Sequence, residues 1–258
     1  MRKQRFHGHW WQLWRDVVGT EWDLVIDLRN SLVSYLLRKK RIARRLKLGH
    51  LHQVEEMAQL LHLTPPPSPQ IWLSAAEREY AASILVDRGP MIGMGPGASH
   101  IAKQWPAERF TELAQRLIGA DGPYPQSGII LFGAPDETAA ARQVEEQLPA
   151  DRVINLCGQL SLLQTAALLE RCDLWVGNDN GQMHMAAALG IPTFGLFGPT
   201  SSTRYGPWGD NGHAIQTMRP YSELSKIQEQ IGADAESLMG SLSVTSVLDE
   251  ICRKGPKA

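Results

Sequence analysis

The sequence predicts an α/β protein in which helices cover both faces of a parallel sheet. From residue 90 to residue 197, short apolar segments alternate with segments whose apolar residues recur at helical spacing, a pattern that favours parallel strands. Most of the short segments end in glycine and polar residues, as strands do at the ligand-binding edge of such sheets. The 258 residues, 43% hydrophobic and 21% charged, suit a globular core of this size. We therefore expect a Rossmann-like domain in the second part of the chain.

The first part of the chain is predicted to form a smaller α/β region. Its expected elements, in order, are a tryptophan-rich helix over residues 10–18, an apolar strand over 22–28, a helix that opens at 31–37 and continues through the basic run 38–45, and helices over 53–61 and 75–86. Four prolines between residues 65 and 69 stop regular structure, so we expect an extended linker there.

The second part repeats a strand–loop–helix rhythm. The expected strands cover residues 91–94, 128–132, 152–155, 173–177 and 192–197, the last of the sheet. The expected helices cover residues 107–118, 137–147, 161–170, 182–189 and, near the end, 244–252. Residues 209–239 carry no clear pattern. From these elements we expect three parts, residues 1–88, 89–241 and 242–258.

The composition excludes several classes of protein. Cys157, Cys172 and Cys252 are odd in number and form no CxxC motif, which favours a reducing compartment and argues against a zinc site. No run of 18 apolar residues is present, so no membrane span is expected. The charged start of the chain is not followed by an apolar stretch, which argues against a secretory signal. These features predict a cytoplasmic location.

The charge is divided unevenly along the chain. Residues 1–50 hold 12 Lys and Arg against 4 Asp and Glu, whereas the remaining residues hold 14 against 23. A basic front suggests an anionic surface or ligand, although the same residues could form a solvated helix face. The basic run lacks interleaved aromatic residues and a known motif, so nucleic acid is not an expected partner.

The first of four unusual loops follows the strand at residue 91. Its small residues, from Gly95 to Ser99, would let backbone N–H groups approach an anion, and Lys103 could add positive charge. Neither the Walker A pattern nor GxGxxG is present, because the glycines stand at alternate positions 93, 95 and 97. The alternative is a glycine-rich strand end beside a surface lysine.

The second and third loops carry carboxylates. Asp136 and Glu137 open a helix, where they could cap it or accept the ribose hydroxyls of a nucleotide. In the third loop, Asp179 lies in a turn that caps the next helix, with His184 in that helix's first turn. This turn could equally direct backbone N–H groups and polar side chains at a ligand. A fourth small polar loop ends at Thr200.

Four motifs in this order resemble those of glycosyltransferase family 9, the bacterial heptosyltransferases of lipopolysaccharide core assembly. The motifs are Pro96-Gly97-Ala98-Ser99 with Lys103, Trp105 and Pro106; Phe132-Gly133-Ala134; Gly177-Asn178-Asp179-x-Gly181-x-Met183-His184; and Leu196-Phe197-Gly198-Pro199-Thr200. Their order and spacing match over roughly residues 90–210. The strand at 22–28 also resembles a late strand of that family's N-terminal domain.

The resemblance implies a GT-B architecture of two Rossmann-like domains, with residues 1–88 as an acceptor-side domain and 89–241 as the nucleotide-sugar-binding domain. It implies inverting transfer from a nucleotide sugar, typically ADP-heptose, to an anionic glycolipid acceptor, with no metal and no other cofactor. Because that acceptor is a lipid, peripheral contact with the inner face of the cytoplasmic membrane is also expected.

The resemblance also assigns residues to roles. Lys103 and Asp179 are the expected catalytic residues, Lys103 on the donor phosphates and Asp179 on a sugar hydroxyl. Other donor-binding residues complete the phosphate and sugar site and flank the nucleoside and ribose. They are Ser99, Glu137, Leu160, Asn180, Gly181 and His184.

Two departures from the family pattern stand out. Asn180 and Gln182 replace the more usual Ser or Thr and Pro. The Gly-Asp motif that carries the family's presumed general base has no counterpart, and Asp27 is only a formal candidate. We therefore expect a chain that lacks the first part of the N-terminal domain.

Two other interpretations remain open. The chain could be a catalytically inactive nucleotide-binding remnant or partner subunit, or another GT-B sugar enzyme such as an epimerase.

Overall fold

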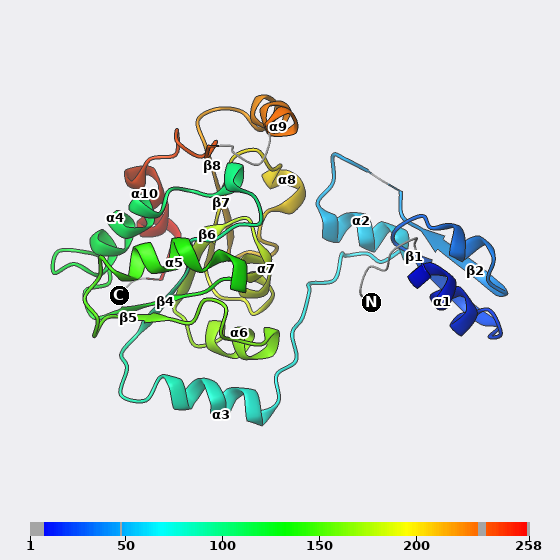
Figure 1. Ribbon diagram of the computed structural model, residues 1–258, viewed down its shortest axis with the longest axis horizontal. Helices are drawn as coiled ribbons and strands as arrows, with labels where there is room; N and C mark the ends of the chain where they lie inside the picture. The colour runs from blue at the N-terminus through cyan, green and yellow to red at the C-terminus, as the bar shows by residue number, and fades with distance from the viewer. Residues whose placement is uncertain (1–7, 47, 232–235, 257–258) are drawn as a thin grey trace. The chain divides into compact units, whose positions relative to one another are not determined.

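The computed structural model describes residues 8–46, 48–231 and 236–256. The chain forms two compact units, Met1–Pro67 and Ser68–Ala258 (Figure 1). Residues 1–7 and Lys47 lie outside the described residues, so part of the expected excess of positive charge in residues 1–50 is not described. None of the described helices is long and apolar enough to cross a membrane.

Six parallel strands form one sheet in the described part of the second unit. In chain order they are β3 (Met91–Gly95), β4 (Gly128–Leu131), β5 (Val153–Asn155), β6 (Leu174–Asn178), β7 (Thr193–Phe197) and β8 (Gly212–Gln216). Their spatial order is β5-β4-β3-β6-β7-β8. This is the doubly wound Rossmann order, whose strand sequence reverses between β3 and β6, where ligands bind beyond the carboxyl ends. The predicted fold class is confirmed.

Helices cover both faces of this sheet. The helices and short 3₁₀ turns of the second unit are α3 (Ala75–Ile84), η3 (Ile101–Lys103), α4 (Ala107–Ile118), η4 (Pro135–Glu137), α5 (Thr138–Glu145), α6 (Leu162–Leu169), α7 (Gly181–Ala188), α8 (Ser202–Tyr205), α9 (Tyr221–Gln230) and α10 (Val244–Lys254). Helices α4, α5 and α10 pack on one face, and α3, α6 and α7 on the other (Figure 1).

The two hydrophobic cores follow from the alternation of side chains along each strand. Ile92 and Met94 point into the core under α4, α5 and α10. Trp175 of β6 points into the opposite core, under α6 and α7. Because both faces are covered, the strands are apolar at nearly every position, as parallel sheets require. This explains why short apolar runs identified β3 to β7 correctly.

The alternate glycines of β3 have a packing cause. A Cβ atom at Gly93 would lie 3.1 Å from the Trp175 indole, and one at Gly95 would lie 2.7 Å from it. Trp175 is fully buried, so its ring needs the space that these two glycines leave. Their spacing therefore reflects contact with a tryptophan rather than contact with an anion.

The last strand of the sheet was not predicted. The sequence analysis placed the final strand at residues 192–197, but β8 pairs in parallel with β7 beyond it. Only Ile215 of its five residues is buried, because β8 is an edge strand. An edge strand needs no continuous apolar run, so the usual signal is absent.

In the described part of the first unit, two parallel strands pair and two helices accompany them. These elements are α1 (Gly8–Val17), β1 (Trp22–Asp27), the 3₁₀ turn η2 (Leu32–Tyr35), β2 (Lys39–Arg44) and α2 (Gln53–Leu60). Helix α2 begins with a reciprocal cap, in which His52 Nδ1 accepts from the Val54 amide and Glu55 accepts from the His52 amide.

The prediction of a continuous helix over residues 31–45 was wrong. The chain makes only η2 and then forms β2, which pairs with β1 from Trp22 opposite Lys39 to Asp27 opposite Arg44. Leucine, lysine and arginine favour helices locally, but strand pairing satisfies the backbone of β1 and overrides that preference. Lys39 reinforces the turn, since its Nζ donates to the Tyr35 carbonyl over 3.3 Å.

Helix α3 packs with the second unit. Arg78 of α3 donates to both carboxylate oxygens of Glu170, which follows α6, over 2.9 and 3.0 Å. The compact units accordingly divide at Pro67–Ser68, before α3, whereas the sequence analysis placed a boundary at residues 88 and 89. The roles expected for residues 1–88, 89–241 and 242–258 stay predictions.

Candidate functional site

Lys103 and Asp179 meet at the point where the strand order reverses. Asp179 directly follows β6 and Lys103 ends η3, which follows β3. The Lys103 Nζ lies 3.3 Å from the Asp179 Oδ2, with 24% and 10% of the two side chains exposed. His184, on the first turn of α7, has its Nε2 4.0 Å from the other Asp179 oxygen. Three residues predicted from two separate motifs are thus brought together.

Buried neighbours fix the position of Lys103. Ala102 before it is fully buried, and so is Trp105 two residues after it. The Trp105 indole packs edge-on against Phe110, with ring centres 4.9 Å apart, and its Nε1 donates to the Leu242 carbonyl over 3.0 Å. The backbone on both sides of Lys103 is therefore held in the core while its amine stays partly exposed.

The organising role of Asn178 was not predicted from the sequence. This residue ends β6 and is fully buried. Its Oδ1 accepts from the Trp105 amide over 3.0 Å, and its Nδ2 donates to the carbonyls of Pro96 at 2.8 Å and Gly97 at 3.3 Å. One side chain thus joins the loop after β3, the segment that carries Lys103 and the end of β6. The sequence signal that could have identified this role is a polar residue at the end of an otherwise apolar strand.

Asn180 caps α7, which begins at Gly181, one residue before the expected start. The Asn180 Oδ1 accepts from the Met183 amide over 3.1 Å and caps the helix, while its Nδ2 donates to the Gly97 carbonyl over 3.2 Å. Gly181 is exposed and has open space around its Cα. The first amides of α7 therefore open beside Asp179, at the positive end of the helix dipole.

Glu137 reaches the same loop from β4. Its Oε2 accepts from the Ala134 amide over 2.8 Å, so the predicted capping role is confirmed for one oxygen. A Cβ atom at Gly97 would lie 2.5 Å from the Glu137 Cβ. Gly97 is therefore required for the close approach of Glu137, while its carbonyl binds Asn178 and Asn180.

The remaining predicted residues are more peripheral. Ser99 is exposed in the loop between β3 and η3, and Leu160 is half-buried against the core under α6. Among the described residues, no hydrogen bond or ion pair links either of them to Lys103 or Asp179. Cys157 lies beside this loop, but burial raises the pKa of its thiol to about 11, and the Glu137 carboxylate adds to the shift. The thiol is therefore protonated at neutral pH.

This arrangement suits an anionic ligand that also carries hydroxyl groups. Lys103 offers a partly buried positive charge, and α7 offers backbone donors beside it. The carboxylates of Asp179 and Glu137 can accept hydrogen bonds from hydroxyls. Within the described ranges, no three His, Cys, Asp or Glu side chains are grouped to hold a metal ion.

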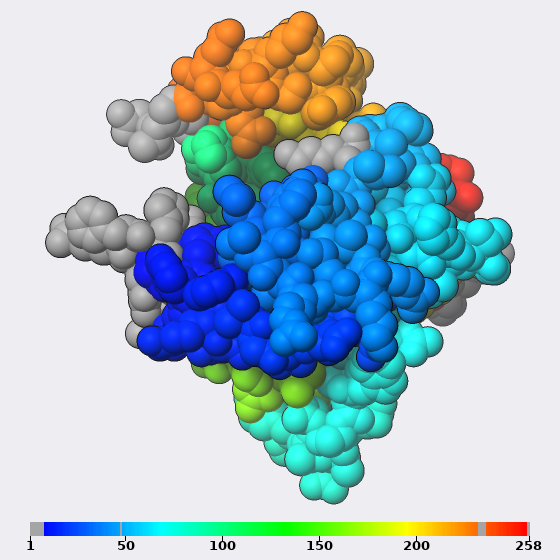
Figure 2. Space-filling view, turned by 90° about the vertical axis from the view of Figure 1, so that its right-hand side faces the viewer, coloured from blue at the N-terminus to red at the C-terminus, as the bar shows by residue number. Residues whose placement is uncertain are grey.

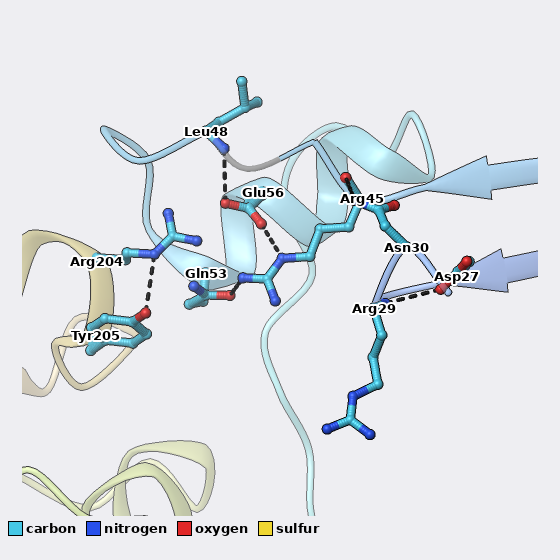
Figure 3. Close-up of polar contacts among 9 residues, drawn as sticks. All are labelled: Asp27, Arg29, Asn30, Arg45, Leu48, Gln53, Glu56, Arg204 and Tyr205. Atoms are coloured by element: carbon cyan, nitrogen blue, oxygen red, sulfur yellow. Dashed lines mark hydrogen bonds and ion pairs between the residues drawn. The ribbon is translucent and has the colours of Figure 1, made fainter. Parts of the chain in front are cut away.

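A second polar network lies at the carboxyl ends of β1 and β2 (Figure 3). Arg45 pairs with the buried Glu56 and also donates to Gln53 over 2.6 Å. The Glu56 Oε2 accepts from the Leu48 amide over 3.2 Å. These contacts fasten the chain after β2 to α2. Breaking such a buried pair from one side leaves an uncompensated charge and costs about 3–5 kcal/mol.

Asp27 stabilises the turn that follows β1. Its carboxylate accepts from the amides of Arg29 over 3.0 Å and Ser31 over 2.8 Å (Figure 3 shows the first). Burial alone would raise the pKa of Asp27, but hydrogen bonds from the Ser34 hydroxyl and these amides together lower it. A carboxylate so engaged is a weak base, which fits its lack of an expected catalytic role.

Comparison with known proteins extends the likeness beyond the four motifs. The family model described as glycosyltransferase family 9 (heptosyltransferase) matches residues 42–232. Lipopolysaccharide heptosyltransferase 2 of Escherichia coli K12 is 34% identical over 164 residues, which cover 61% of this chain and 46% of that protein. The chain spans about half the length of the curated relatives it matches.

Two solved structures share the fold. Glycosyl transferase family 9 of Veillonella parvula matches with a TM-score of 0.77 and 22% identity, over 94% of this chain and 76% of that one. The E. coli ADP-heptose LPS heptosyltransferase II matches with a TM-score of 0.74 and 24% identity, over 95% and 80%. With a family model that matches most of its length, this chain belongs to glycosyltransferase family 9.

Proposed function

We propose that this chain transfers heptose from ADP-heptose to a glycolipid of the lipopolysaccharide core type, with inversion and without a metal ion. The observation that carries the proposal is the Lys103–Asp179 pair at the point where the strand order reverses. The names of the relatives support it, since one is a lipopolysaccharide heptosyltransferase and another names ADP-heptose.

In the proposed donor complex, Lys103 leaves the Asp179 carboxylate for the diphosphate. The departing diphosphate gains negative charge in the transition state, and a preorganised cation stabilises that charge without a metal. The first amides of α7, at Asn180 and Gly181, and the His184 imidazole would complete the phosphate and sugar site. Asp179, released from Lys103, would then accept a sugar hydroxyl.

The nucleoside would lie over the loops after β4 and β5. Glu137 uses one carboxylate oxygen to cap its own helix, so the other would receive the ribose hydroxyls. Leu160 would flank the base with apolar surface, and Ser99 would add a hydroxyl near the phosphates. These assignments extend the geometry by the roles that the family motifs imply.

On the acceptor side we propose an anionic glycolipid presented at the inner face of the cytoplasmic membrane. The first unit contributes positive charge, with eight Lys and Arg against four Asp and Glu over residues 8–46. No general base is assigned, because both oxygens of Asp27 are engaged by backbone amides.

A second candidate is a nucleotide-binding chain without transfer activity of its own. The engagement of Asp27 favours it, since an acceptor hydroxyl needs a base with a free carboxylate oxygen. In this case the donor site would be intact and the acceptor reaction absent.

Calorimetric titration with ADP, ADP-heptose and UDP separates these possibilities. We expect ADP and ADP-heptose to bind and UDP to bind more weakly. A folded chain that binds neither adenine nucleotide would contradict the donor site. Binding of ADP-heptose with no transfer to a heptose-deficient lipopolysaccharide acceptor would support the second candidate instead.

A further inference from the structure

An apolar hollow of about 300 Å³ lies within the first unit. Among the described residues it is lined by Trp10, Trp11, Trp14, Leu32, Val33 and Leu36, which we call the tryptophan face. Helix α1 supplies the three tryptophans and the η2 turn supplies the aliphatic residues. Its rim is open to solvent, with Trp11 70%, Leu32 78% and Leu36 60% exposed. Contiguous exposed apolar surface of this kind marks an interaction site.

Positive charges border the tryptophan face. The Arg29 guanidinium lies 5.9 Å from the Trp10 ring centre, and that of Arg44 lies 3.3 Å from the Tyr35 ring centre, at the end of η2. The amine of Lys39 bonds to the Tyr35 carbonyl. Lys39 and Arg44 thus contact the last residue of η2, and Arg29 contacts a tryptophan of α1.

Among the described residues, these three cations differ from neighbouring ones because they form no ion pair with a carboxylate. In the described residues, Lys40 pairs with Asp23 and Arg45 pairs with Glu56. None of the ion pairs seen in that part of the chain gives Arg29, Lys39 or Arg44 a carboxylate. Arg29 is exposed, so its charge remains available to an external anion. Arg44 also donates to the Ser34 hydroxyl over 3.5 Å, and Lys39 to the Leu37 carbonyl over 3.1 Å.

We propose that the tryptophan face docks on the surface of an anionic phospholipid bilayer. Tryptophan favours the interface between water and hydrocarbon, because its ring is largely apolar while its N–H stays hydrated. Cations beside buried apolar groups add attraction to anionic headgroups. The tryptophan face has both components, because cations border its apolar centre. In Figure 2, the dark blue of α1 adjoins the lighter blue of the following residues on the face shown.

This inference deepens the proposed function, because a glycolipid acceptor would be presented at such a surface. Its test needs neither donor nor acceptor. Failure of membrane binding would leave the ADP titration unaffected, and failure of the titration would leave the membrane result unaffected.

Co-sedimentation with sugar-free vesicles tests the inference. The full chain is mixed with vesicles of phosphatidylcholine alone, or of phosphatidylcholine with 30% phosphatidylglycerol, at low and high salt. We expect binding to the anionic vesicles at low salt, little binding to the neutral ones, and release at high salt, since surface attraction is screened.

Two variants test the two components of the face. The double variant Trp11→Ser, Leu36→Ser changes only exposed side chains and should weaken vesicle binding about tenfold or more. Arg29→Gln should weaken it about fivefold, the effect of one cation near an anionic surface. Matched controls outside the face are Trp72→Ser, a tryptophan that is 80% exposed, and Arg142→Gln, an exposed arginine. Both controls should bind as the unmodified chain does.

Three outcomes would overturn the proposal. The first is no binding to anionic vesicles by a folded chain. The second is unchanged binding of the Trp11→Ser, Leu36→Ser variant. In the third, light scattering without vesicles shows an oligomer that the same variant dissociates, which would assign the face to a protein contact.

Discussion

At the scale of single residues, the buried amide of Asn178 joins three segments of the site. Asn178 bonds to the backbone at Pro96, Gly97 and Trp105, segments that the chain reaches some 70 to 80 residues earlier. Because all three bonds are buried, losing them would leave unpaired polar groups at about 1–3 kcal/mol each. The position of Lys103 depends on this anchoring, since Trp105 lies two residues from it.

Lys103 is predicted to bind the donor through its charge. The Lys103→Ala variant should weaken ADP binding by about 1.5–3 kcal/mol, the range for hydrogen bonds to charged groups. Titration with adenosine, which lacks phosphates, should show almost no change. Lys226→Ala, at an exposed lysine of α9, is the control. Unchanged ADP affinity in Lys103→Ala would remove this residue from the site.

Asp179 is predicted to act on the sugar rather than on the nucleotide. The Asp179→Ala variant should reduce transfer strongly while ADP affinity stays nearly the same, because the lost carboxylate pairs with Lys103 only in the absence of donor. Titration and a transfer assay on one preparation compare the two effects. Asp249→Ala, at an exposed acid of α10, should change neither. An equal loss of both in Asp179→Ala would make the aspartate structural.

At the scale of elements, the loop after β3 depends on one glycine. Gly97 lies where Glu137 of the β4 loop and the amides of Asn178 and Asn180 converge. Three strands thus contribute to one loop conformation. The contacts at Gly97 are hydrogen bonds from side-chain amides to its carbonyl rather than ion pairs, so they should depend little on salt.

The variant Gly97→Ala tests this convergence. Its Cβ would lie 2.5 Å from the Glu137 Cβ, so the loops must separate, at a cost of about 1–3 kcal/mol in unfolding free energy. ADP affinity should fall with it. Gly240→Ala, where nothing lies within 4 Å, is the matched control and should unfold as the unmodified chain does. Chemical denaturation measures both, and equal stability of the two variants would contradict the predicted contact.

At the scale of the whole molecule, the chain consists of two compact units whose described sheets differ in size. The second unit has a doubly wound sheet with helices on both faces. The described part of the first unit has a two-stranded parallel sheet, on which Leu24 and Ile26 remain 38% and 47% exposed. Parallel sheets are ordinarily covered on both faces, so the first unit should be the less stable of the two.

Limited proteolysis should reveal this division. Residues 61–74 join α2 to α3 without regular structure, and Trp72 in this segment is 80% exposed. Brief chymotrypsin treatment should therefore cut first within residues 61–74 and leave the second unit intact, as read by mass spectrometry. Trp72→Ser should slow this cut. Early fragments that begin within β3 to β8 would contradict the division.

The sequence by itself determined most elements of the second unit, from β3 to β7 with the helices between them. Its strands are apolar throughout because both sheet faces are buried, and its loops carry the motifs of the family, so local pattern was sufficient to place β3 to β7 and the residues Lys103, Asp179 and Glu137. Family membership followed from the same motifs.

Tertiary structure alone decided the rest. The basic run pairs as β2, and β8 forms the sheet edge. Trp175 packs against the glycines of β3, and Asn178 bonds to the loop that follows this strand. Lys103 and Asp179 are 76 residues apart, and only strand order brings them to 3.3 Å. The physical reason is that strand pairing and buried polar contacts join segments distant in the chain, and no local pattern encodes them.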